Sequence, residues 1–513
     1  MIDLFRQVHV RKRPVPGPRL VYNPDMTLEP EICYRAVSSR DARFDGRFFS
    51  GVTSTGIYCR PICPARTPKR RNLRYYRCAA EAAEAGFRPC LRCRPESAPG
   101  TPAWSGNSTT VARALRLIQQ GSLGEAGIDG LADRLGVGAR HLRRLFAERL
   151  GVSPMAVELT RRVQFAIKLL HETALPITQI AGLSGFRSVR RFNAAIQKAC
   201  RRPPRELRRE GARRIAGERI QLKLSYRLPF DFDGLIGFLK LRAIPGVEQV
   251  RGDCYRRTVR LAGTDGTIDV CRVDDRPALR LSVPIRLAVQ LPEIVARVRG
   301  LLDLDADPAC IDKLLGRDAT LRTLVRRRPG LRVPGCWDRF ELAVRAILGQ
   351  QVTVKGARTL ATRLVERYGE PLSEPADGLN RLFPTADRLA NLRATSVGVP
   401  ETRAGAIRAL ARAVRDSQLD LDDVLELESA VERIRELPGV GEWTAQYIAM
   451  RALGEPDAFP GSDLAVRRAL THGSELPSAA ETARCAERWR PWRSYATMHL
   501  WLGDTRQAKG RKR

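Results

Sequence analysis

The chain has 513 residues, too many for a single hydrophobic core, so roughly three to five domains are expected. Its 89 lysines and arginines against 56 acidic residues give a formal net charge of +33, which indicates a polyanionic partner, most plausibly nucleic acid. A basic surface that is only solvated is the alternative. The sequence begins without the apolar core of a signal peptide and contains no apolar run long enough to span a membrane, so we expect a cytoplasmic protein.

Changes in composition divide the chain into segments that differ in their expected structure. The fold class predicted is multidomain and mainly α, with α+β parts. Short alternating runs on either side of Asp265-Gly266 predict a β-hairpin in the strand-rich segment. The predicted segments are a basic tail expected to be disordered (1–25), a cysteine-rich domain (26–95), a linker (96–108), a helical domain (109–210), an α+β domain that follows a basic hinge (218–330), a second helical domain (331–505) and a basic tail (506–513).

Four cysteines occur as two close pairs, Cys59 with Cys63 and Cys90 with Cys93. Each pair can bind one edge of a tetrahedral metal site from a turn, and in a reducing cytoplasm such pairs indicate zinc rather than disulfides. Cys78 lies between the pairs without a partner at ligand spacing, so it is interpreted as a core thiol. The sequence predicts one zinc ion per chain, bound by the four paired cysteines.

The residues around these pairs, TGIYCRP and GFRPC-x2-C, resemble the zinc domain of the Ada (adaptive response) proteins. The resemblance implies that Cys59 is both a zinc ligand and a nucleophile, which takes a methyl group irreversibly from a methylated DNA phosphate. Four thiolate ligands make that chemistry reasonable, because metal binding keeps the sulfurs deprotonated. A zinc ribbon that only docks on DNA is the alternative. The basic residues expected to attract the DNA backbone are Arg60, Arg66, Lys69, Arg70 and Arg71.

Two helix-turn-helix patterns follow the cysteine-rich domain. The first, GIDGLADRLGVGARHLRRLFAERL, spaces its apolar residues at helical intervals around a glycine turn, and a second occurs in PITQIAGLSGFRSVRRFNAAIQKAC. Together they resemble the AraC-type DNA-binding domain, in which the second unit would place Arg187, Arg190 and Arg191 on a recognition helix. Arg201 stands where that family usually has glycine, so the end of the second unit is expected to differ. A helical bundle merely coated with arginine is the alternative.

A glycine-flanked turn in LPGVGEWTAQYIAMRAL predicts a helix-hairpin-helix, in which Gly439 and Gly441 expose backbone N–H groups to a DNA phosphate, with a monovalent cation as a candidate bridge. With the downstream Asp463, the hairpin resembles the helix-hairpin-helix DNA glycosylase superfamily. The stretches VPGCWDRFELAVRAILGQQVTVKGA, AERWRPWRSYATMHLW and PFDFDGLIGFLKLRAI narrow the resemblance to 3-methyladenine DNA glycosylase II, the AlkA type.

That resemblance makes Asp463 the catalytic carboxylate, which would stabilise the positive charge that develops on the sugar as the base departs. Asp457 is the neighbouring competitor, and a simple helix-capping role for Asp463 is the alternative. No lysine occurs from Leu437 to Leu453, where the lyases of the superfamily carry theirs, so a monofunctional hydrolase is expected. No thiol occurs in the PCHR setting of O6-alkylguanine repair, and nothing supports that activity.

Aromatic residues are expected to form the walls of the base pocket, since electron-rich faces stack well on cationic alkylated purines. Trp489 and Trp501 are interpreted as ordinary core residues. A flipped base leaves a gap in the duplex, and the AlkA-type glycosylases fill it with a side chain from the GQ turn. The best-known member uses leucine there, whereas this chain has Gln351, so the residue that acts as the wedge and the lesion preference stay open. The pocket residues implied by the resemblance are Trp443, Tyr447, Trp492 and Phe238.

The sequence therefore predicts a bacterial alkylation-response protein that excises alkylated purines such as 3-methyladenine, accepts a methyl group from DNA and regulates transcription. The expected partners are double-stranded, alkylated and promoter DNA, with RNA polymerase as a further candidate and a nucleoid-associated location. Two alternatives stay open. One is a transcription factor whose glycosylase half is an inactive DNA clamp, and the other is a repair enzyme whose front half only targets it.

Overall fold

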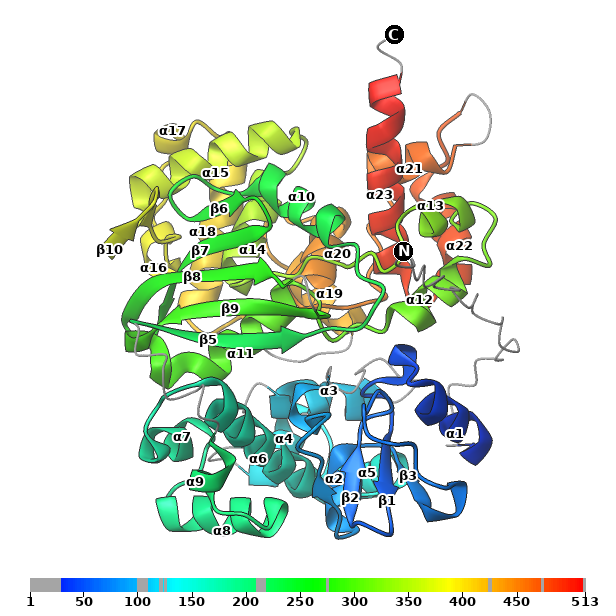
Figure 1. Ribbon diagram of the computed structural model, residues 1–513. Coiled ribbons are helices and arrows are strands. Elements are labelled where there is room, and N and C mark those ends of the chain that lie inside the picture. Colours follow the sequence, from blue (N-terminus) through cyan, green and yellow to red (C-terminus); the bar gives the residue numbers. More distant parts are fainter. Residues whose placement is uncertain are drawn as a thin grey trace, which may run out of the picture.

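The computed structural model of the chain describes its main modules and leaves out the N-terminal tail, most of the linker 96–108 and the basic hinge after residue 208 (Figure 1). In the view of Figure 1, helices and strands up to residue 208 lie below and those from residue 219 onward lie above. No helix in the described part of the chain is long and apolar enough to cross a membrane. The described residues are 29–98, 109–119, 123, 127–208, 218–273, 276–422, 427–471 and 475–510.

The cysteine module (residues 29–98) is built on a small sheet with the strand order β3-β1-β2-β4. Its apolar core is small and divided in two: α1 covers Phe48 and a few other side chains, and a second cluster consists of Phe49, Tyr58, Ala79 and Ala82. A module with so little buried surface depends on an additional stabilising element such as a metal. Its elements are α1 (Pro30–Ser39), β1 (Phe49–Val52), β2 (Ile57–Cys59), β3 (Leu73–Tyr76), α2 (Ala79–Glu84) and β4 (Arg88–Pro89).

The helical module (residues 109–208) contains the two predicted helix-turn-helix units, α4 with α5 and α7 with α8, which the long helix α6 connects. Arg201 has the left-handed φ of 55° that a glycine would favour, yet its N–H donates to Gln197 O at 2.8 Å and caps α8 normally. The expected irregularity is therefore confined to one residue. The helices are α3 (Thr109–Gln119), α4 (Gly127–Arg134), α5 (Ala139–Leu150), α6 (Pro154–Glu172), α7 (Ile177–Leu183), α8 (Val189–Cys200) and α9 (Pro204–Leu207).

The sheet module (residues 218–338) holds an antiparallel sheet with the order β5-β9-β8-β7-β6. The elements are β5 (Arg219–Ser225), α10 (Phe232–Arg242), β6 (Glu248–Arg251), β7 (Cys254–Leu261), β8 (Thr264–Arg272), β9 (Ala278–Pro284), the 3-10 helix η5 (Ile285–Gln290), α11 (Leu291–Leu301), α12 (Pro308–Leu315) and α13 (Arg322–Arg327).

The predicted hairpin forms between β7 and β8, but the prediction that its turn lies at Asp265-Gly266 is wrong. The turn is Ala262-Gly263, with φ values of 46° and 79°, whereas Asp265 and Gly266 lie inside β8 opposite Arg260 and Val259. Two-residue hairpin turns favour positive φ at both positions, and here the glycine at Gly263 satisfies the second. The same strands carry a disulfide between Cys254 and Cys271, which the sequence did not reveal.

The C-terminal module (residues 339–510) is helical, apart from a short two-stranded sheet of β10 (Pro371–Ala376) and β11 (Leu379–Arg381). Helix α23 runs through residue 510, so part of the expected tail 506–513 continues this helix. The remaining elements are α14 (Arg339–Leu348), α15 (Val354–Tyr368), α16 (Ala386–Leu389), α17 (Ala394–Val397), α18 (Glu401–Arg415), α19 (Leu427–Arg435), α20 (Glu442–Arg451), α21 (Leu464–Ala469), α22 (Ala479–Ala486), η6 (Glu487–Trp489) and α23 (Arg493–Gly510).

The hydrophobic cores run across the boundaries of these modules. Cys78 of the cysteine module shares a core with the first helix-turn-helix unit. Leu222 on β5 shares another with Ile167 on the connecting helix α6 and Phe192 of the second unit. Phe238 on α10 belongs to the core of the C-terminal module. Since each junction buries apolar surface, the modules are packed together rather than strung on linkers.

Candidate functional site

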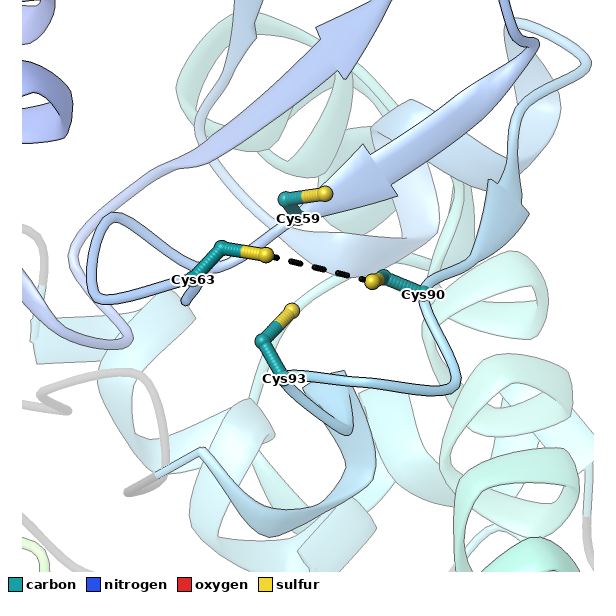
Figure 2. A group of neighbouring side chains, drawn as sticks. All are labelled: Cys59, Cys63, Cys90 and Cys93. Carbon is teal, nitrogen blue, oxygen red and sulfur yellow. Dashed lines mark hydrogen bonds between the residues drawn. The ribbon is translucent and has the colours of Figure 1, made fainter. Parts of the chain in front are cut away.

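The four paired cysteines meet at one point in the cysteine module (Figure 2). Cys59 ends strand β2, Cys90 follows β4, and the turns after these strands bring Cys63 and Cys93 to face them. The four Sγ atoms all lie within 4.8 Å of one another, and Cys63 Sγ is 4.0 Å from Cys90 Sγ. Tetrahedral zinc with bonds of about 2.3 Å requires sulfur separations of about 3.8 Å. The donor set and its spacing therefore fit a zinc ion.

The fifth cysteine of this region stands apart from the cluster, as the sequence predicted. Cys78 is buried at the N-cap of α2, and its thiol points to Leu150 O at 3.9 Å. Burial raises the pKa of this thiol to about 11, so it stays protonated and unreactive at neutral pH. Within the cluster, hydrogen bonds among the four thiols lower the pKa of Cys63 and Cys90 and raise the pKa of Cys59 and Cys93.

Arg60 does not face the solvent, contrary to the expectation that it attracts the DNA backbone. It is only 8% exposed, and its guanidinium binds both oxygens of the buried Asp45. Its backbone N–H donates to Cys93 Sγ at 3.4 Å, and its Nη1 donates to Cys93 O at 3.1 Å. Arg60 therefore braces the turn that carries Cys93. The basic residues that remain exposed around the cluster are Arg66, Lys69, Arg70 and Arg71.

In the second candidate site, Asp463 is the N-cap of helix α21. Its Oδ1 accepts hydrogen bonds from the backbone N–H groups of Ala465 and Val466, each at 3.0 Å. Two indole N–H groups also reach the carboxylate: Trp443 donates to Oδ2 at 2.9 Å and Trp501 to Oδ1 at 3.0 Å. Asp463 thus caps a helix, is also oriented by two tryptophans, and lies in a half-buried position.

The competitor Asp457 has a different environment. Its carboxylate binds Arg493 at 2.8 Å and also pairs with Arg490, so two guanidinium groups neutralise it. A carboxylate so engaged holds the start of α23 in place and is a poor choice to stabilise a charge that develops on a substrate. The geometry therefore favours Asp463.

The aromatic residues expected in the pocket divide into two groups. Trp443 and Tyr447 lie one turn apart on α20 and stack with ring centroids 5.3 Å apart, and Trp501 lies 6.1 Å from Tyr447. Trp492 is instead buried in the core, with its ring edge-on to Tyr495. Trp501 packs against the core as the sequence predicts, but its indole N–H also donates to Asp463. Trp492, expected in the pocket wall, is buried in the core.

The ring of Phe238 is also covered by side chains of the protein itself. The guanidinium of Arg242 lies 3.6 Å from the centroid of its ring and that of Arg451 lies 4.9 Å away. Arg451 also donates to Tyr447 Oη at 2.8 Å, and its charge contributes to lowering the pKa of Tyr447, although burial alone would raise it. A cationic base would meet two arginines there, so Phe238 is a poor stacking partner for one. Trp489 is fully buried, as the sequence predicted.

The signal for Trp501 was present but ambiguous. Tryptophan at the end of a helical run such as SYATMHLW can face the core or the site, and only the placement of α23 against α21 decides which. Helix α23 packs along α21 and so brings Trp501 to the N-terminus of α21. Trp492, by contrast, directly precedes α23 and is buried in the core.

The hairpin between α19 and α20 has the backbone that the glycines predict. Gly439 has a φ of 78°, and a Cβ at this position would lie 2.9 Å from Ala406 Cβ. Gly441 is the N-cap of α20, so N–H groups at the start of that helix are available to an anion. Gln350 bonds Gly439 O at 3.0 Å, which places the exposed Gln351, with its left-handed φ of 55°, beside the hairpin.

The arginines of the second recognition helix lie on the surface. Arg187 precedes α8, and Arg190 and Arg191 lie in its first turn, all three exposed. Ser188 caps this helix by accepting a hydrogen bond from Arg191 N at 3.2 Å, which fixes the direction in which the helix begins. Exposed arginines at the start of this helix are available to nucleic acid.

Four family models match successive parts of the chain. They are the metal binding domain of Ada (residues 32–96), a helix-turn-helix domain (131–210), the AlkA N-terminal domain (221–338) and the HhH-GPD superfamily of base excision DNA repair proteins (344–493). The order of the matches is the order of the modules.

Curated relatives resemble the chain over different extents. A probable bifunctional transcriptional activator/DNA repair enzyme AlkA of Mycobacterium tuberculosis is 44% identical over 92% of this chain and 96% of its own length. DNA-3-methyladenine glycosylase 2 of Escherichia coli is 34% identical over 55% of this chain and 96% of its own length. The bifunctional transcriptional activator/DNA repair enzyme Ada of Escherichia coli is 40% identical over 24% of this chain and 33% of its own length.

Proposed function

Because the chain belongs to the family of bifunctional AlkA-type transcriptional activator/DNA repair enzymes, we propose that it repairs alkylated DNA and reports the damage. Its C-terminal half releases alkylated purines such as 3-methyladenine. Its cysteine module accepts a methyl group from DNA methylphosphotriesters, and its helical module directs the protein to a promoter. The observation that carries the repair activity is the half-buried carboxylate of Asp463, held by two indole N–H groups beside stacked aromatic rings.

The chemistry proposed for the C-terminal half is hydrolysis of the bond between base and sugar. As that bond breaks, its electron pair leaves with the base and positive charge develops on the sugar, where the carboxylate of Asp463 stabilises it. Water then adds to the sugar carbon and loses a proton. Trp443 and Tyr447 offer a stacked aromatic wall for a flipped base. Without a lysine between Leu437 and Leu453, no amine is placed there to cleave the strand, so the enzyme is monofunctional.

DNA is positioned by the hairpin and the neighbouring turn. N–H groups at the start of α20 bind a backbone phosphate, with a monovalent cation as an additional bridge between the hairpin and that phosphate. Gln351 is the residue that fills the space left by the flipped nucleotide, because it is exposed and lies beside the hairpin. The exposed arginines of α8 bind promoter DNA, and RNA polymerase is a further partner in a nucleoid-associated, cytoplasmic protein.

Methyl transfer takes place at the cysteine cluster, which holds zinc through Cys59, Cys63, Cys90 and Cys93. Bound zinc keeps these sulfurs in the thiolate form at neutral pH. Cys59 and Cys63 are partly exposed, whereas Cys90 and Cys93 are buried, so burial narrows the nucleophile to two residues. The position of Cys59 in the TGIYCRP motif decides between them. The thiolate attacks the methyl carbon, a C–S bond forms, and the C–O bond electrons leave with the phosphodiester, so each chain reacts once.

One experiment tests both activities. The purified, zinc-loaded protein is incubated with methylated duplex DNA, and released bases and the mass of the protein are measured in the same sample. We expect free 3-methyladenine to accumulate over many turnovers and the protein to gain a single methyl group on the Cys59 peptide. Methyl addition without base release would instead favour a transcription factor whose C-terminal half is an inactive clamp. Base release without methyl addition would favour a zinc module that only docks on DNA.

A further inference from the structure

A buried glutamate lies near the start of α6, the helix that connects the two helix-turn-helix units. Glu158 is 1% exposed, so its carboxylate is removed from water. Two arginines one turn further along α6 bind it. Arg161 Nε and Nη2 donate to the two carboxylate oxygens at 2.7 and 2.9 Å, and Arg162 Nε donates to Oε1 at 2.6 Å. These guanidinium groups compensate a charge that would otherwise be costly to bury.

One of these arginines also reaches the second helix-turn-helix unit. Arg162 Nη1 donates to Gly185 O at 3.0 Å, in the turn that joins α7 to α8. The approach is close, because a Cβ on Gly185 would lie 3.2 Å from Arg162 Nε. Arg162 therefore uses one side of its guanidinium for Glu158 and the other for the turn. A path of hydrogen bonds runs from the buried carboxylate on α6 to the backbone of this turn.

The turn at Gly185 leads directly into helix α8. The next residue, Phe186, packs edge-on against Phe192 of α8, with ring centroids 5.5 Å apart. Arg190 and Arg191 then lie exposed in the first turn of α8. The place where α8 begins, and with it the position of these arginines, therefore depends on where the turn is held.

The same end of α6 adjoins the first unit. Helix α5 ends at Leu150, and α6 begins at Pro154 after its N-cap, Ser153. Glu158 thus lies close to the end of α5 along the chain, while its partner Arg162 contacts the turn before α8. Two helices can enter the major groove on one side of a duplex only when their spacing matches the groove repeat, about one helical turn of DNA.

We propose that Glu158 is a positioning residue for promoter recognition, which acts through Arg162 to hold α8 at the spacing from α5 at which both helices enter the DNA. The inference rests on the promoter binding proposed above. Glu158 does not contact DNA itself, because it is buried and carries the same sign of charge as a phosphate. Its charged hydrogen bond orients Arg162 toward Gly185 O, and without it the arginine is free to turn away from the turn.

The sign of the expected effect separates this role from simple electrostatics. Glu158→Gln removes one negative charge, so attraction between the protein and DNA alone would tighten binding. A positioning role predicts weaker binding to a specific sequence, because α8 is no longer held in place. Glu148→Gln is the matched control. Glu148 is exposed on α5 and pairs with Arg144 at 3.8 Å, so its loss changes the net charge equally without touching the turn before α8.

The experiment uses the full-length, zinc-loaded protein and a duplex that the parent protein selects from a random-sequence pool. Affinities for this duplex and for a scrambled version are measured at one salt concentration, and hydroxyl-radical footprints are recorded on the selected duplex. Arg190→Gln identifies the protected segment that α8 contacts. We expect Glu158→Gln to bind the selected duplex at least about tenfold more weakly than the parent, as expected for one lost base contact. It should lose protection of the α8 segment alone and bind the scrambled duplex no more weakly than the parent.

A second pair of variants tests the route through Arg162. Arg162→Gln should also lose the α8 segment, and combining it with Glu158→Gln should cause no further loss of affinity, because both changes break one connection. Arg161→Gln removes the neighbouring partner of Glu158 but leaves the bond between Arg162 and Gly185 O in place. That variant should retain protection of the α8 segment.

The contrary outcomes are distinct from one another. If Glu158→Gln bound the selected duplex as tightly as Glu148→Gln, only net charge would matter and the inference would fail. Loss of both protected segments together would show that Glu158 supports the fold of the whole module and not the placement of α8. Additive losses in the double variant would remove Arg162 from the route. If the parent protein selected no sequence from the pool, the proposed promoter binding would fail, and this inference with it.

Discussion

A single carboxylate, Asp463, serves two purposes in the C-terminal half. Its Oδ1 caps α21 through two backbone N–H groups, and both oxygens accept indole N–H groups. All of these are neutral donors, so they orient the carboxylate and stabilise its charge without neutralising it, which two guanidinium groups do at Asp457. A substrate cation would therefore meet an uncompensated negative charge of fixed direction.

This arrangement predicts the behaviour of Asp463→Asn. Asparagine is as good an N-cap as aspartate, so the melting temperature should change little. Base release in single-turnover assays should fall by about 10²- to 10³-fold, because the charge that stabilises the developing cation is gone. The comparison is Asp457→Asn, which should lower the melting temperature by breaking the pairs with Arg490 and Arg493 while leaving the rate nearly unchanged. Release at the parental rate by Asp463→Asn would remove Asp463 from the mechanism.

The indole of Trp501 gives a second prediction at the residue scale. Trp501→Phe keeps a ring near Tyr447 but removes the N–H that donates to Asp463 Oδ1. A hydrogen bond to a charged group contributes about 1.5–3 kcal/mol, so the rate of base release should fall by about 10- to 100-fold. Trp489→Phe is the matched control, since Trp489 Nε1 is buried with no hydrogen-bond partner in the described part of the chain. That change should cost stability and spare the rate, and equal rate losses in the two variants would contradict the role of Trp501.

At the scale of elements, the turn between α14 and α15 combines backbone strain with exposure. Gln351 has a φ of 55°, a conformation that disfavours residues other than glycine by about 1 kcal/mol. The hydrogen bonds of Gln350 to Gly439 O and Thr444 Oγ1, both at 3.0 Å, hold this turn to the hairpin. Strain kept at such a position agrees with a role for the side chain in contact with DNA.

Replacing this residue should separate stability from function. Gln351→Gly relieves the backbone strain, so the melting temperature should stay level or rise, yet base release from duplex DNA should fall because the flipped nucleotide leaves a space unfilled. Release from single-stranded DNA, which needs no wedge, should be unaffected. Ser417→Gly is the control, because Ser417 has a similar φ of 56° at the end of α18. If Gln351→Gly released bases from duplex DNA as fast as the parent, another residue would have to be the wedge.

The elements also show how far sequence reasoning reaches. Features that depend on local spacing were predictable: the cysteine pairs form a cluster, the helix-turn-helix units form, and the hairpin has glycine where φ is positive. The roles of Trp492 and Trp501 were not, because both precede or belong to one helix and only its packing against α21 shows which faces Asp463. Likewise, the β-turn moved to Ala262-Gly263 because strand register, not the Asp-Gly signal, determined the pairing.

At the scale of the whole molecule, the hydrophobic cores extend across the domain boundaries that composition suggests. Residues on α6 and α8 share a core with β5, and residues near α2 share one with α3 to α5. Polar contacts between the cysteine module and the sheet module add to this packing: Arg227 Nε donates to Asp45 O at 3.1 Å, and Arg47 pairs with Asp307. The sequence does not predict these contacts, since single arginines and aspartates occur throughout the chain. The C-terminal module, which carries Asp463, therefore has a large core. The cysteine module has small clusters and shares further buried surface with the helical module.

Removal of zinc should expose this difference. The cysteine module has only two small clusters of buried side chains, one around Phe48 and one around Phe49 and Tyr58. Without metal the four cysteines no longer cross-link its strands, so the module should unfold. Its contacts through Asp45 and Arg47 would be lost, and the first unfolding transition of the full-length protein should move to lower temperature. Asp463 and its two tryptophans lie in the C-terminal module, which has a core of its own, so base release after chelation should stay within about twofold of the untreated rate, while methyl acceptance disappears. Calorimetry, base release and protein mass before and after chelation, with zinc re-addition as the control, measure these outcomes. Loss of base release together with methyl acceptance would show instead that the repair site depends on the folded sensor.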